Sequence, residues 1–200
     1  MDEHYHSIHG AVQESNCIFI GAGYDRCHAD PLNILEVGFG TGLNTLLTAL
    51  NCASGKRVVN YTAIEKYPVG DTIIRSLNHY LYAGERGKEL SDLIHSAPWD
   101  RWVTIFNNFN IRKINGDMSG YPLSGKYELI YFDAFGPDKQ PEMWTPGVFA
   151  SIASVTEKGG ALVTYSAKGE VKRNLKVCGF EVTLLPGPPG KRQIIRAVKI

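Results

Sequence analysis

Three features that are scarce in this sequence exclude broad classes of protein. Cysteine occurs four times in 200 residues and never as a CxxC pair, which is too sparse for a disulfide scaffold. No apolar run approaches the length of about 20 residues that a membrane-spanning helix needs, and no signal peptide is predicted at Met1. The formal net charge is only +1, so any nucleic-acid partner must be held by a local basic patch. We therefore expect reduced thiols, a cytoplasmic location and no membrane partner.

The composition that remains is typical of one globular domain. Of the 200 residues, 44% are hydrophobic and 20% are charged, which is enough apolar material for a full core. No internal repeat or low-complexity linker interrupts the chain. We expect a single domain over residues 1–200, in which about the first 30 residues form an N-terminal extension that packs on the core.

Short apolar runs alternate with helical patterns along the chain. Strands are expected at 33–37, 58–64, 111–117, 128–132 and 160–166, and helices from 43, within 69–100, from 146 to about 157, and through 171–178. Two further strands, 180–185 and 192–198, flank PGPPGK without a helix between them, which predicts an antiparallel hairpin. The alternation predicts an α/β fold with a doubly wound, mostly parallel sheet. With the closing hairpin, this is the Rossmann-like architecture of class I S-adenosylmethionine (SAM) methyltransferases.

The sequence EVGFGTGLN, residues 36–44, follows the first expected strand and is rich in glycine. A dinucleotide-binding turn needs a third glycine where this chain has Leu43, and an acid about 20 residues further on. The acid that ends the second strand, Glu65, comes 27 residues after Gly38 (65 minus 38), and no Gly-Lys-Ser/Thr of a phosphate loop follows. The pattern Glu-x-Gly-x-Gly-x-Gly instead favours a turn that binds SAM, although such a turn also occurs for packing alone.

Acidic residues at the ends of the expected strands support the same hypothesis. Glu36 would offset the positive charge of SAM, Glu65 would accept the ribose hydroxyls, and Asp117 would lie near the adenine. Ligands of such sheets bind at the carboxyl ends of the strands, where all these residues are expected. The predicted cofactor-binding residues are Glu36, Gly38, Phe39, Gly40, Thr41, Gly42, Asn44, Glu65, Lys66, Asp117, Met118 and Asp133.

The most specific stretch is YFDAFGPDKQPEMWT, residues 131–145. It resembles the motif D-[GA]-F-[AG]-P-x-K-x-P-[ED]-M-W of the MnmC and MnmD methyltransferases, which finish the wobble uridine of some bacterial tRNAs. Further similar segments are GFGTGLN (38–44), IEKYP (64–68), VTYSAKGEVKRNL (163–175), GFEV (179–182), PGPPGKR (186–192) and DEHYHSIHGAVQES (2–15). The resemblance implies SAM-dependent methyl transfer to the exocyclic amine of 5-aminomethyl-(2-thio)uridine, with the anticodon stem-loop of tRNA as partner.

The chain differs from the bifunctional members of this family in one respect. MnmC continues into a flavin-dependent oxidase half, for which these 200 residues leave no room. We therefore expect no oxidase domain, and a separate flavin-dependent oxidase or upstream modification enzyme that supplies the amine. Family members also usually carry a short segment before DEHYH, so the N-terminal edge of the domain stays open.

Asp133, directly after the expected strand 128–132, is the predicted catalytic residue. Its carboxylate would orient the amine and take up its proton. The aromatic residues Phe135, Trp144 and Tyr165 are candidates to stack on a base that is turned out of the RNA. Core packing is an equally good explanation for Trp144 and Tyr165.

The C-terminal part of the chain is basic. The segment from Lys168 to Lys199 contains eight basic and two acidic residues, a local net charge of +6. The rest of the chain therefore has a net charge of about −5 (1 minus 6). This pattern predicts either a solvated helix face or contact with tRNA phosphates. The predicted substrate-binding residues are Phe135, Lys139, Trp144, Tyr165, Lys172, Arg173, Lys191 and Arg192. His4, His6 and His9 lie close together but lack the spacing of a standard metal site, so no metal is predicted.

Two other functions stay open at this point. A spermidine-type polyamine synthase, which is an aminopropyltransferase, uses decarboxylated SAM on a similar sheet, but it would need further acids to hold a polyamine. A non-catalytic subunit with this fold would not need the acids at the strand ends. Binding of SAM, followed by methyl transfer to hypomodified tRNA, separates the three functions.

Overall fold

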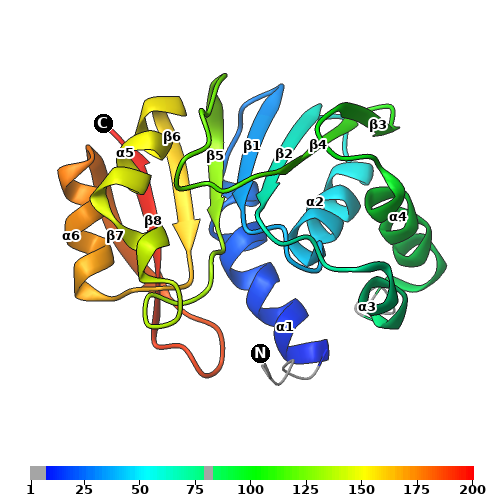
Figure 1. Ribbon diagram of the computed structural model, residues 1–200, viewed down its shortest axis with the longest axis horizontal. Helices are drawn as coiled ribbons and strands as arrows, with labels where there is room; N and C mark the ends of the chain where they lie inside the picture. The colour runs from blue at the N-terminus through cyan, green and yellow to red at the C-terminus, as the bar shows by residue number, and fades with distance from the viewer. Residues whose placement is uncertain (1–7, 79–82) are drawn as a thin grey trace.

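The computed structural model describes residues 8–78 and 83–200, and within them eight strands form one sheet (Figure 1). The strand order is β3-β4-β2-β1-β5-β6-β8-β7. Five strands run parallel to their neighbours in the centre of the sheet: β1 (Leu32–Val37), β2 (Val59–Glu65), β4 (Phe109–Asn115), β5 (Tyr127–Phe132) and β6 (Thr156–Thr164). The predicted doubly wound α/β fold is confirmed.

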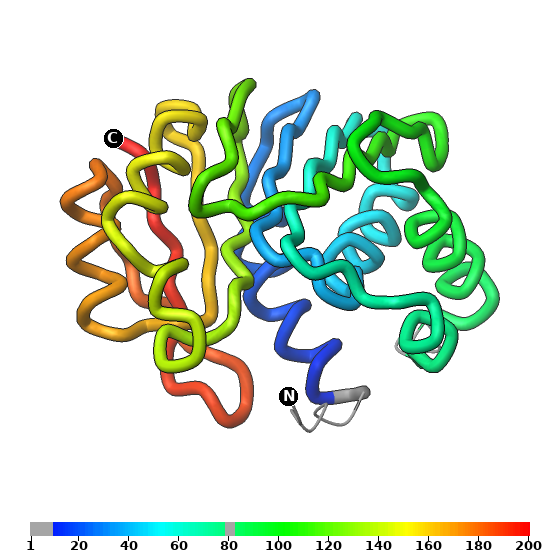
Figure 2. The backbone as a smooth tube through the Cα atoms, in the orientation of Figure 1, coloured from blue at the N-terminus to red at the C-terminus, as the bar shows by residue number. Residues whose placement is uncertain are grey.

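The predicted C-terminal hairpin is also confirmed. Strands β7 (Phe180–Pro186) and β8 (Gln193–Lys199) pair antiparallel, and β8 inserts between β7 and β6, again antiparallel. The loop 187–192 that joins them lies below the carboxyl ends of the central strands, beside the segment that follows β5 (Figure 2). The hairpin therefore brings a loop from the end of the chain to the edge of the sheet where ligands bind.

Helices cover both faces of the sheet because each face is apolar. One face packs against α1 (Ile8–Ser15), the π-helical turn η1 (Asn16–Gly21), α2 (Leu43–Ala53) and α4 (Gly84–Ser96). The other packs against α5 (Pro146–Val155) and α6 (Gly169–Val177). Three short elements complete the described chain: η2 (Tyr24–Arg26), α3 (Asp71–Ser76) and η4 (Pro141–Trp144).

The helix boundaries follow local chemistry where the sequence predicted them. Thr145 caps α5 through its hydroxyl, which accepts the amide of Val148 at 3.4 Å, and Pro146 occupies the first turn. Gly179, with φ of +82°, ends α6 in the left-handed conformation that suits glycine. The buried positions of α6 are Val171 and Leu175, as its predicted inner face requires.

Two sequence-based assignments were wrong. No strand was expected at residues 102–106, yet β3 (Trp102–Phe106) pairs antiparallel with β4 at the edge of the sheet. Its side chains are exposed or half-buried, so it lacks the buried apolar run by which the other strands were recognised. The helix expected to reach about 157 ends at Val155, and β6 begins at Thr156 rather than 160, because Thr156 already pairs with Tyr127 of β5.

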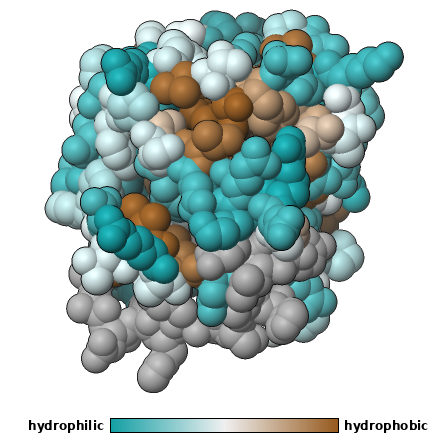
Figure 3. Space-filling model, turned by 90° about the vertical axis from the view of Figure 1, so that its right-hand side faces the viewer, coloured by the Kyte–Doolittle hydropathy of each residue, from teal (hydrophilic) through white to brown (hydrophobic). Residues whose placement is uncertain are grey.

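The edge strand β3 belongs to a partly apolar side of the molecule. Figure 3 shows apolar side chains gathered on this side, which is formed by β3, α3 and α4 (Figure 1). Large hydrophobic side chains exposed on these elements include Ile73, Leu93 and Trp102. None of the helices in the described segments is both long and apolar enough to cross a membrane.

Candidate active site

A cavity of about 570 Å³ opens at the carboxyl ends of the central strands, a volume that suits a small-molecule ligand. It lies where the strand order reverses, since β2 and β5 flank β1 on opposite sides. The cavity brings together most of the sequence-predicted site residues. Those that line it are Gly38, Phe39, Gly40, Thr41, Asn44, Glu65, Lys66, Asp117, Met118, Asp133, Phe135, Lys139, Tyr165 and Lys191.

The glycine loop between β1 and α2 forms one wall of the cavity. Gly38, Gly40 and Gly42 all have positive φ, at +91°, +51° and +73°. At Gly38 an added Cβ would lie 2.7 Å from the backbone oxygen of Asp133, so this glycine lets the loop pack against the end of β5. At Gly40 nothing lies within 4 Å of that position, so a side chain there would project into open space.

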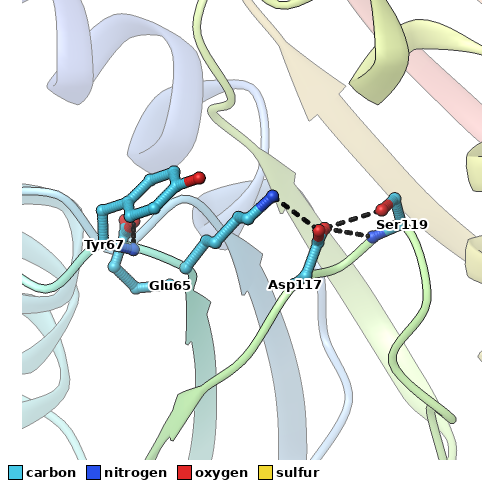
Figure 4. Close-up of polar contacts among 5 residues, drawn as sticks. Glu65, Tyr67, Asp117 and Ser119 are labelled. Carbon is cyan, nitrogen blue, oxygen red and sulfur yellow. Dashed lines mark hydrogen bonds and ion pairs between the residues drawn. The ribbon is translucent and has the colours of Figure 1, made fainter.

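Glu65 holds the glycine loop at the end of β2. One of its carboxylate oxygens accepts the backbone amide of Gly40 at 3.0 Å, and the other accepts the amide of Tyr67 at 2.8 Å. Figure 4 shows the bond to Tyr67. The acid predicted to bind ribose hydroxyls therefore also braces the two loops on either side of it.

Asp117, after β4, is fixed from two sides (Figure 4). Lys66 forms an ion pair with it at 2.7 Å, and Ser119 donates its backbone amide at 3.0 Å and its hydroxyl at 2.7 Å. The hydrogen bond from Lys66, and then those from Ser119, lower the pKa of Asp117 to about 2. Asp117 is thus a fixed, ionised acceptor at the edge of the cavity.

Asp133 and Glu36 are joined beneath the loop by the amide of Asn44. The Asn44 side chain donates to Glu36 at 3.0 Å and to Asp133 at 2.8 Å, while Thr45 donates to the second Glu36 oxygen at 3.0 Å. Burial raises the pKa of Asp133 to about 7, against the lowering effect of the Asn44 hydrogen bond. Burial likewise raises the pKa of Glu36, to about 8.

Glu36 and Gly42 do not line the cavity. The Glu36 side chain is fully buried and accepts hydrogen bonds from α2, a position that does not fit the direct cofactor contact predicted for it. An added Cβ at Gly42 would lie 3.0 Å from the ring of Phe39, which indicates a packing role.

The far side of the cavity carries the predicted substrate residues. Phe135 is 54% exposed at the start of the loop after β5, as a stacking residue should be. Tyr165 donates its hydroxyl to the backbone oxygen of Ala134 at 2.7 Å, and Lys191 lies over its ring at 4.5 Å. Lys191 also forms an ion pair at 3.2 Å with Glu14 of α1. The loop 187–192 is thereby tied to α1 at the mouth of the cavity.

The remaining predicted substrate residues lie elsewhere. Trp144 is only 2% exposed, packs on Phe132 and donates its indole N–H to the backbone oxygen of Phe135 at 2.7 Å. It is therefore a core residue that supports the loop from behind, and the stacking role predicted for it does not fit this position. Lys172 and Arg173 line a separate groove of about 380 Å³ between α6 and β7. Arg192 is exposed in the loop 187–192.

Six of the eight basic residues of the C-terminal part fall into two groups. Lys168 pairs with Asp138, Lys191 with Glu14, and Arg196 donates to the backbone oxygen of Ala22. Those on α6, in contrast, face the groove against β7: Lys172, Arg173 and Lys176. The basic surface is thus smaller than the count of charges suggests, and it is concentrated along one helix.

Sequence reasoning missed three polar residues near the cavity: Glu14, Ser15 and Lys113. Ser15 donates its hydroxyl to the oxygen of the Asn44 amide. Lys113 is 1% exposed, and its ammonium lies 5.6 Å from the ring of Phe39 in the glycine loop. Lys113 fell in the strand expected at 111–117 and the other two in the N-terminal extension, but no local pattern indicates which of these residues meet across the fold.

No metal was predicted at the N-terminal histidines, of which His4 and His6 lie outside the described residues. In the part of the chain that the structure describes, no group of three or more His, Cys, Asp or Glu side chains could hold a metal ion.

Known proteins resemble this chain in both sequence and structure. Residues 105–200 match the model of a family described as S-adenosyl-L-methionine-dependent methyltransferases. The bifunctional tRNA 5-methylaminomethyl-2-thiouridine biosynthesis protein MnmC of Leptospira interrogans is 30% identical over 209 residues, covering 97% of this chain and 32% of its own length. The MnmC protein of Ralstonia nicotianae is 28% identical, with 96% and 31% coverage. The chain thus spans about a third of the length of these relatives.

Among solved structures, MnmC2 from Aquifex aeolicus superposes with a TM-score of 0.72 at 23% identity, over 94% of this chain and 60% of that one. This chain is thus similar to the MnmC-type SAM-dependent methyltransferases over nearly its whole length. SAM-bound CalS10, an amino pentose methyltransferase from Micromonospora echinaspora, shares the fold over the full length of both chains, with a TM-score of 0.56 at 12% identity. The fold of this chain is therefore that of class I SAM-dependent enzymes.

SAM is the cofactor of this methyltransferase family, and the cavity fits it chemically. The backbone of the glycine loop is free of side chains at Gly40, so a ligand can approach it closely. Glu65 and the ionised Asp117 supply acceptors at the ends of β2 and β4, for the hydroxyls and amine of a nucleoside. Asp133 and the exposed Phe135 also line the cavity.

Proposed function

We propose that this MnmC-type methyltransferase transfers the methyl group of SAM to the exocyclic amine of 5-aminomethyl-(2-thio)uridine at the wobble position of tRNA. The likeness to MnmC proteins supports the choice of substrate, since their names describe the biosynthesis of the methylated nucleoside. We place the reaction in the cytoplasm, with the anticodon stem-loop as the part of tRNA that is bound. A separate flavin-dependent oxidase or upstream modification enzyme would supply the amine.

The observation that carries this proposal is the position and pKa of Asp133. The carboxyl group lies at the end of β5, on the cavity, and burial raises its pKa to about 7. A general base works best when its pKa lies near the operating pH, because it is then both ionised and able to accept a proton. Asp133 is therefore suited to hold an amine and to remove its proton near neutral pH.

The neighbouring residues support an amine on a flat base as the acceptor. When bound, SAM supplies an electrophilic methyl group on a positively charged sulfur. Asp133 would orient the amine for in-line attack and accept the proton that the nitrogen loses, while Phe135 would stack on the base. Lys139 and Lys191, which also line the cavity, would meet the phosphates beside the extruded nucleotide.

The two alternatives are not favoured. The matched family is described as methyltransferases, and the relatives named above are named for the biosynthesis of a tRNA nucleoside, which argues against an aminopropyl-transferring polyamine synthase. A non-catalytic subunit has no need of an acid with a pKa near 7 in an open cavity, whereas Asp133 has this property.

Mass spectrometry of nucleosides tests the proposal directly. tRNA from cells that lack the final methylation would be incubated with the protein and SAM, then digested to nucleosides. We expect a gain of one methyl group on 5-aminomethyl-(2-thio)uridine, and none when SAM or the protein is omitted. Methylation of another nucleoside, or transfer of an aminopropyl group to a polyamine, would show that the proposed function is wrong.

A further inference from the structure

Asn44 stands at the centre of a buried chain of hydrogen bonds that begins at α1 and ends at Asp133. Both hydrogens of its amide are used, one by Glu36 at 3.0 Å and one by Asp133 at 2.8 Å. Its oxygen accepts the hydroxyl of Ser15. Asn44 and Ser15 are only 5% and 4% exposed, so water has little access to either group.

The arrangement leaves the Asn44 amide one favourable orientation. If the amide turned over, its oxygen would face two carboxyl groups, and its N–H₂ group would face the hydroxyl of Ser15. Glu36 accepts a second side-chain hydrogen bond, from Thr45. For Asp133, the side-chain hydrogen bond that lowers its pKa comes from Asn44. Asp133 therefore depends on Asn44 more than Glu36 does.

We propose that Asn44 is a positioning residue for Asp133: it holds the carboxyl group in place on the cavity and favours its ionised form, while Ser15 of α1 anchors the amide. The proposal rests on the proposed function, in which ionised Asp133 accepts the proton of the amine. Asn44 was expected to bind the cofactor, and its bonds to two carboxyl groups assign it this other role.

Other charged and titratable groups face Asp133 and set the background for this effect. Besides burial, Glu14 of α1 raises the pKa of Asp133 by repulsion and Lys191 of the loop 187–192 lowers it. Asp133 in turn adds to the effect of burial in raising the pKa of Glu36 of β1. Tyr165, at the end of β6, is uncharged near neutral pH because burial, and then Asp133, raise its pKa. None of these groups donates a hydrogen bond to Asp133 among the contacts of the described residues, whereas Asn44 does.

The test compares Asn44→Ala with the wild type in two measurements. In the protein without substrate, NMR of the carboxyl carbon of Asp133, assigned with Asp133→Asn, should show a titration midpoint higher by about one pH unit, because a hydrogen bond to the charged form is lost. In methyl transfer, kcat/KM should fall about tenfold at pH 7 and recover to within about threefold of wild type at pH 9.

Two matched variants separate this role from general damage. Asn51→Ala removes an amide from the last turn of the same helix, where it bonds the backbone oxygen of Leu47 at 2.8 Å, and should shift neither measurement. Ser15→Ala should shift the Asp133 titration in the same direction by less than Asn44→Ala, and Ser15→Thr, which keeps the hydroxyl, should restore it.

An unchanged Asp133 titration in Asn44→Ala, or a loss of activity that is equal at all pH values, would overturn the proposal. The NMR measurement needs neither SAM nor tRNA. If the wild type failed to methylate tRNA, the proposed function would fall, and the titration would still decide whether Asn44 controls Asp133.

Discussion

The carboxylate of Glu65 accepts a hydrogen bond from the backbone amide of Gly40, so the end of β2 holds the middle of the glycine loop. The bond is 3.0 Å long and joins residues that are 25 positions apart in the sequence. It turns the side-chain position of Gly40 toward open space. The loop thereby offers bare backbone to a ligand, which only glycine at this position allows.

Gly40→Val should weaken SAM binding at least about tenfold, or about 1.4 kcal/mol, because the side chain would project into the cofactor site. Gly125→Val is the matched control: Gly125 also has positive φ, +86°, and open space around it, but it does not line the cavity. Both variants place a β-branched side chain at a positive φ, and only the first should raise the dissociation constant in calorimetry. Equal affinities for the two variants would remove the loop from the cofactor site.

Asp133→Asn should slow methyl transfer by at least about tenfold, since the amide cannot accept a proton. In the wild type, kcat/KM should show a limb that rises with pH through about 7, the pKa to which burial raises Asp133, because the ionised form is the active one; the titration of the substrate amine adds to it. Asp133→Asn should lose this limb and keep only the titration of the substrate amine. A wild-type rate and pH profile in Asp133→Asn would contradict the role of Asp133 as base.

The groove on α6 predicts a salt-dependent contact with the tRNA backbone. If Lys172 and Arg173 meet phosphates, changing both to Gln should flatten the log–log slope of affinity against salt by about 1–2 units, since fewer counterions are released. The effect should be similar for every tRNA, because phosphate contacts position the protein and carry no sequence information.

The control for the groove is a double variant with the same loss of charge elsewhere. Lys56 and Lys158 are exposed and lie before β2 and at the start of β6, away from the cavity. Changing both to Gln should leave the salt slope unaltered. If the two double variants behave alike, the basic residues of α6 form only a solvated helix face, and tRNA binds elsewhere.

Lys113 should make the stability of the protein rise between pH 7 and pH 9. Its ammonium is buried beneath the glycine loop, donates to the backbone oxygen of His95 at 2.9 Å and lies 4.9 Å from the ring of Trp99. Burial lowers its pKa from 10.5 to about 8, so folding disfavours the charged form. The full penalty applies below about pH 8 and disappears as the pH approaches 10.5.

Lys113→Met keeps the apolar stem without the charge and therefore tests this dependence. From pH 7 to pH 9 the wild type should gain about 1 kcal/mol of unfolding free energy relative to Lys113→Met, measured by denaturant titration. Burial also lowers the pKa of His95 from 6.5, so His95 titrates below this window. A constant difference between the two proteins across the window would show that Lys113 keeps its ordinary pKa.

Local patterns in the sequence were enough to predict the order of the parallel strands along the chain and the C-terminal hairpin. Apolar runs of strand length recur wherever a strand is buried on both faces, and β1, β2, β5 and β8 are of this kind. The glycine loop was equally visible, because positive φ at Gly38, Gly40 and Gly42 demands a residue without a side chain. The motif around Asp133 indicated the chemistry at the end of the fourth expected strand.

Only the tertiary structure decided which side chains meet. Edge strand β3 has too few buried positions to be recognised alone and exists because β4 offers it a partner. Trp144 and Phe135 are nine residues apart in one motif, yet packing buries the first and exposes the second. Ser15, Asn44 and Asp133 come from three distant segments, and Lys113 lies under a loop that is more than 70 positions away. Such contacts depend on how elements pack across the sheet, which no local periodicity encodes.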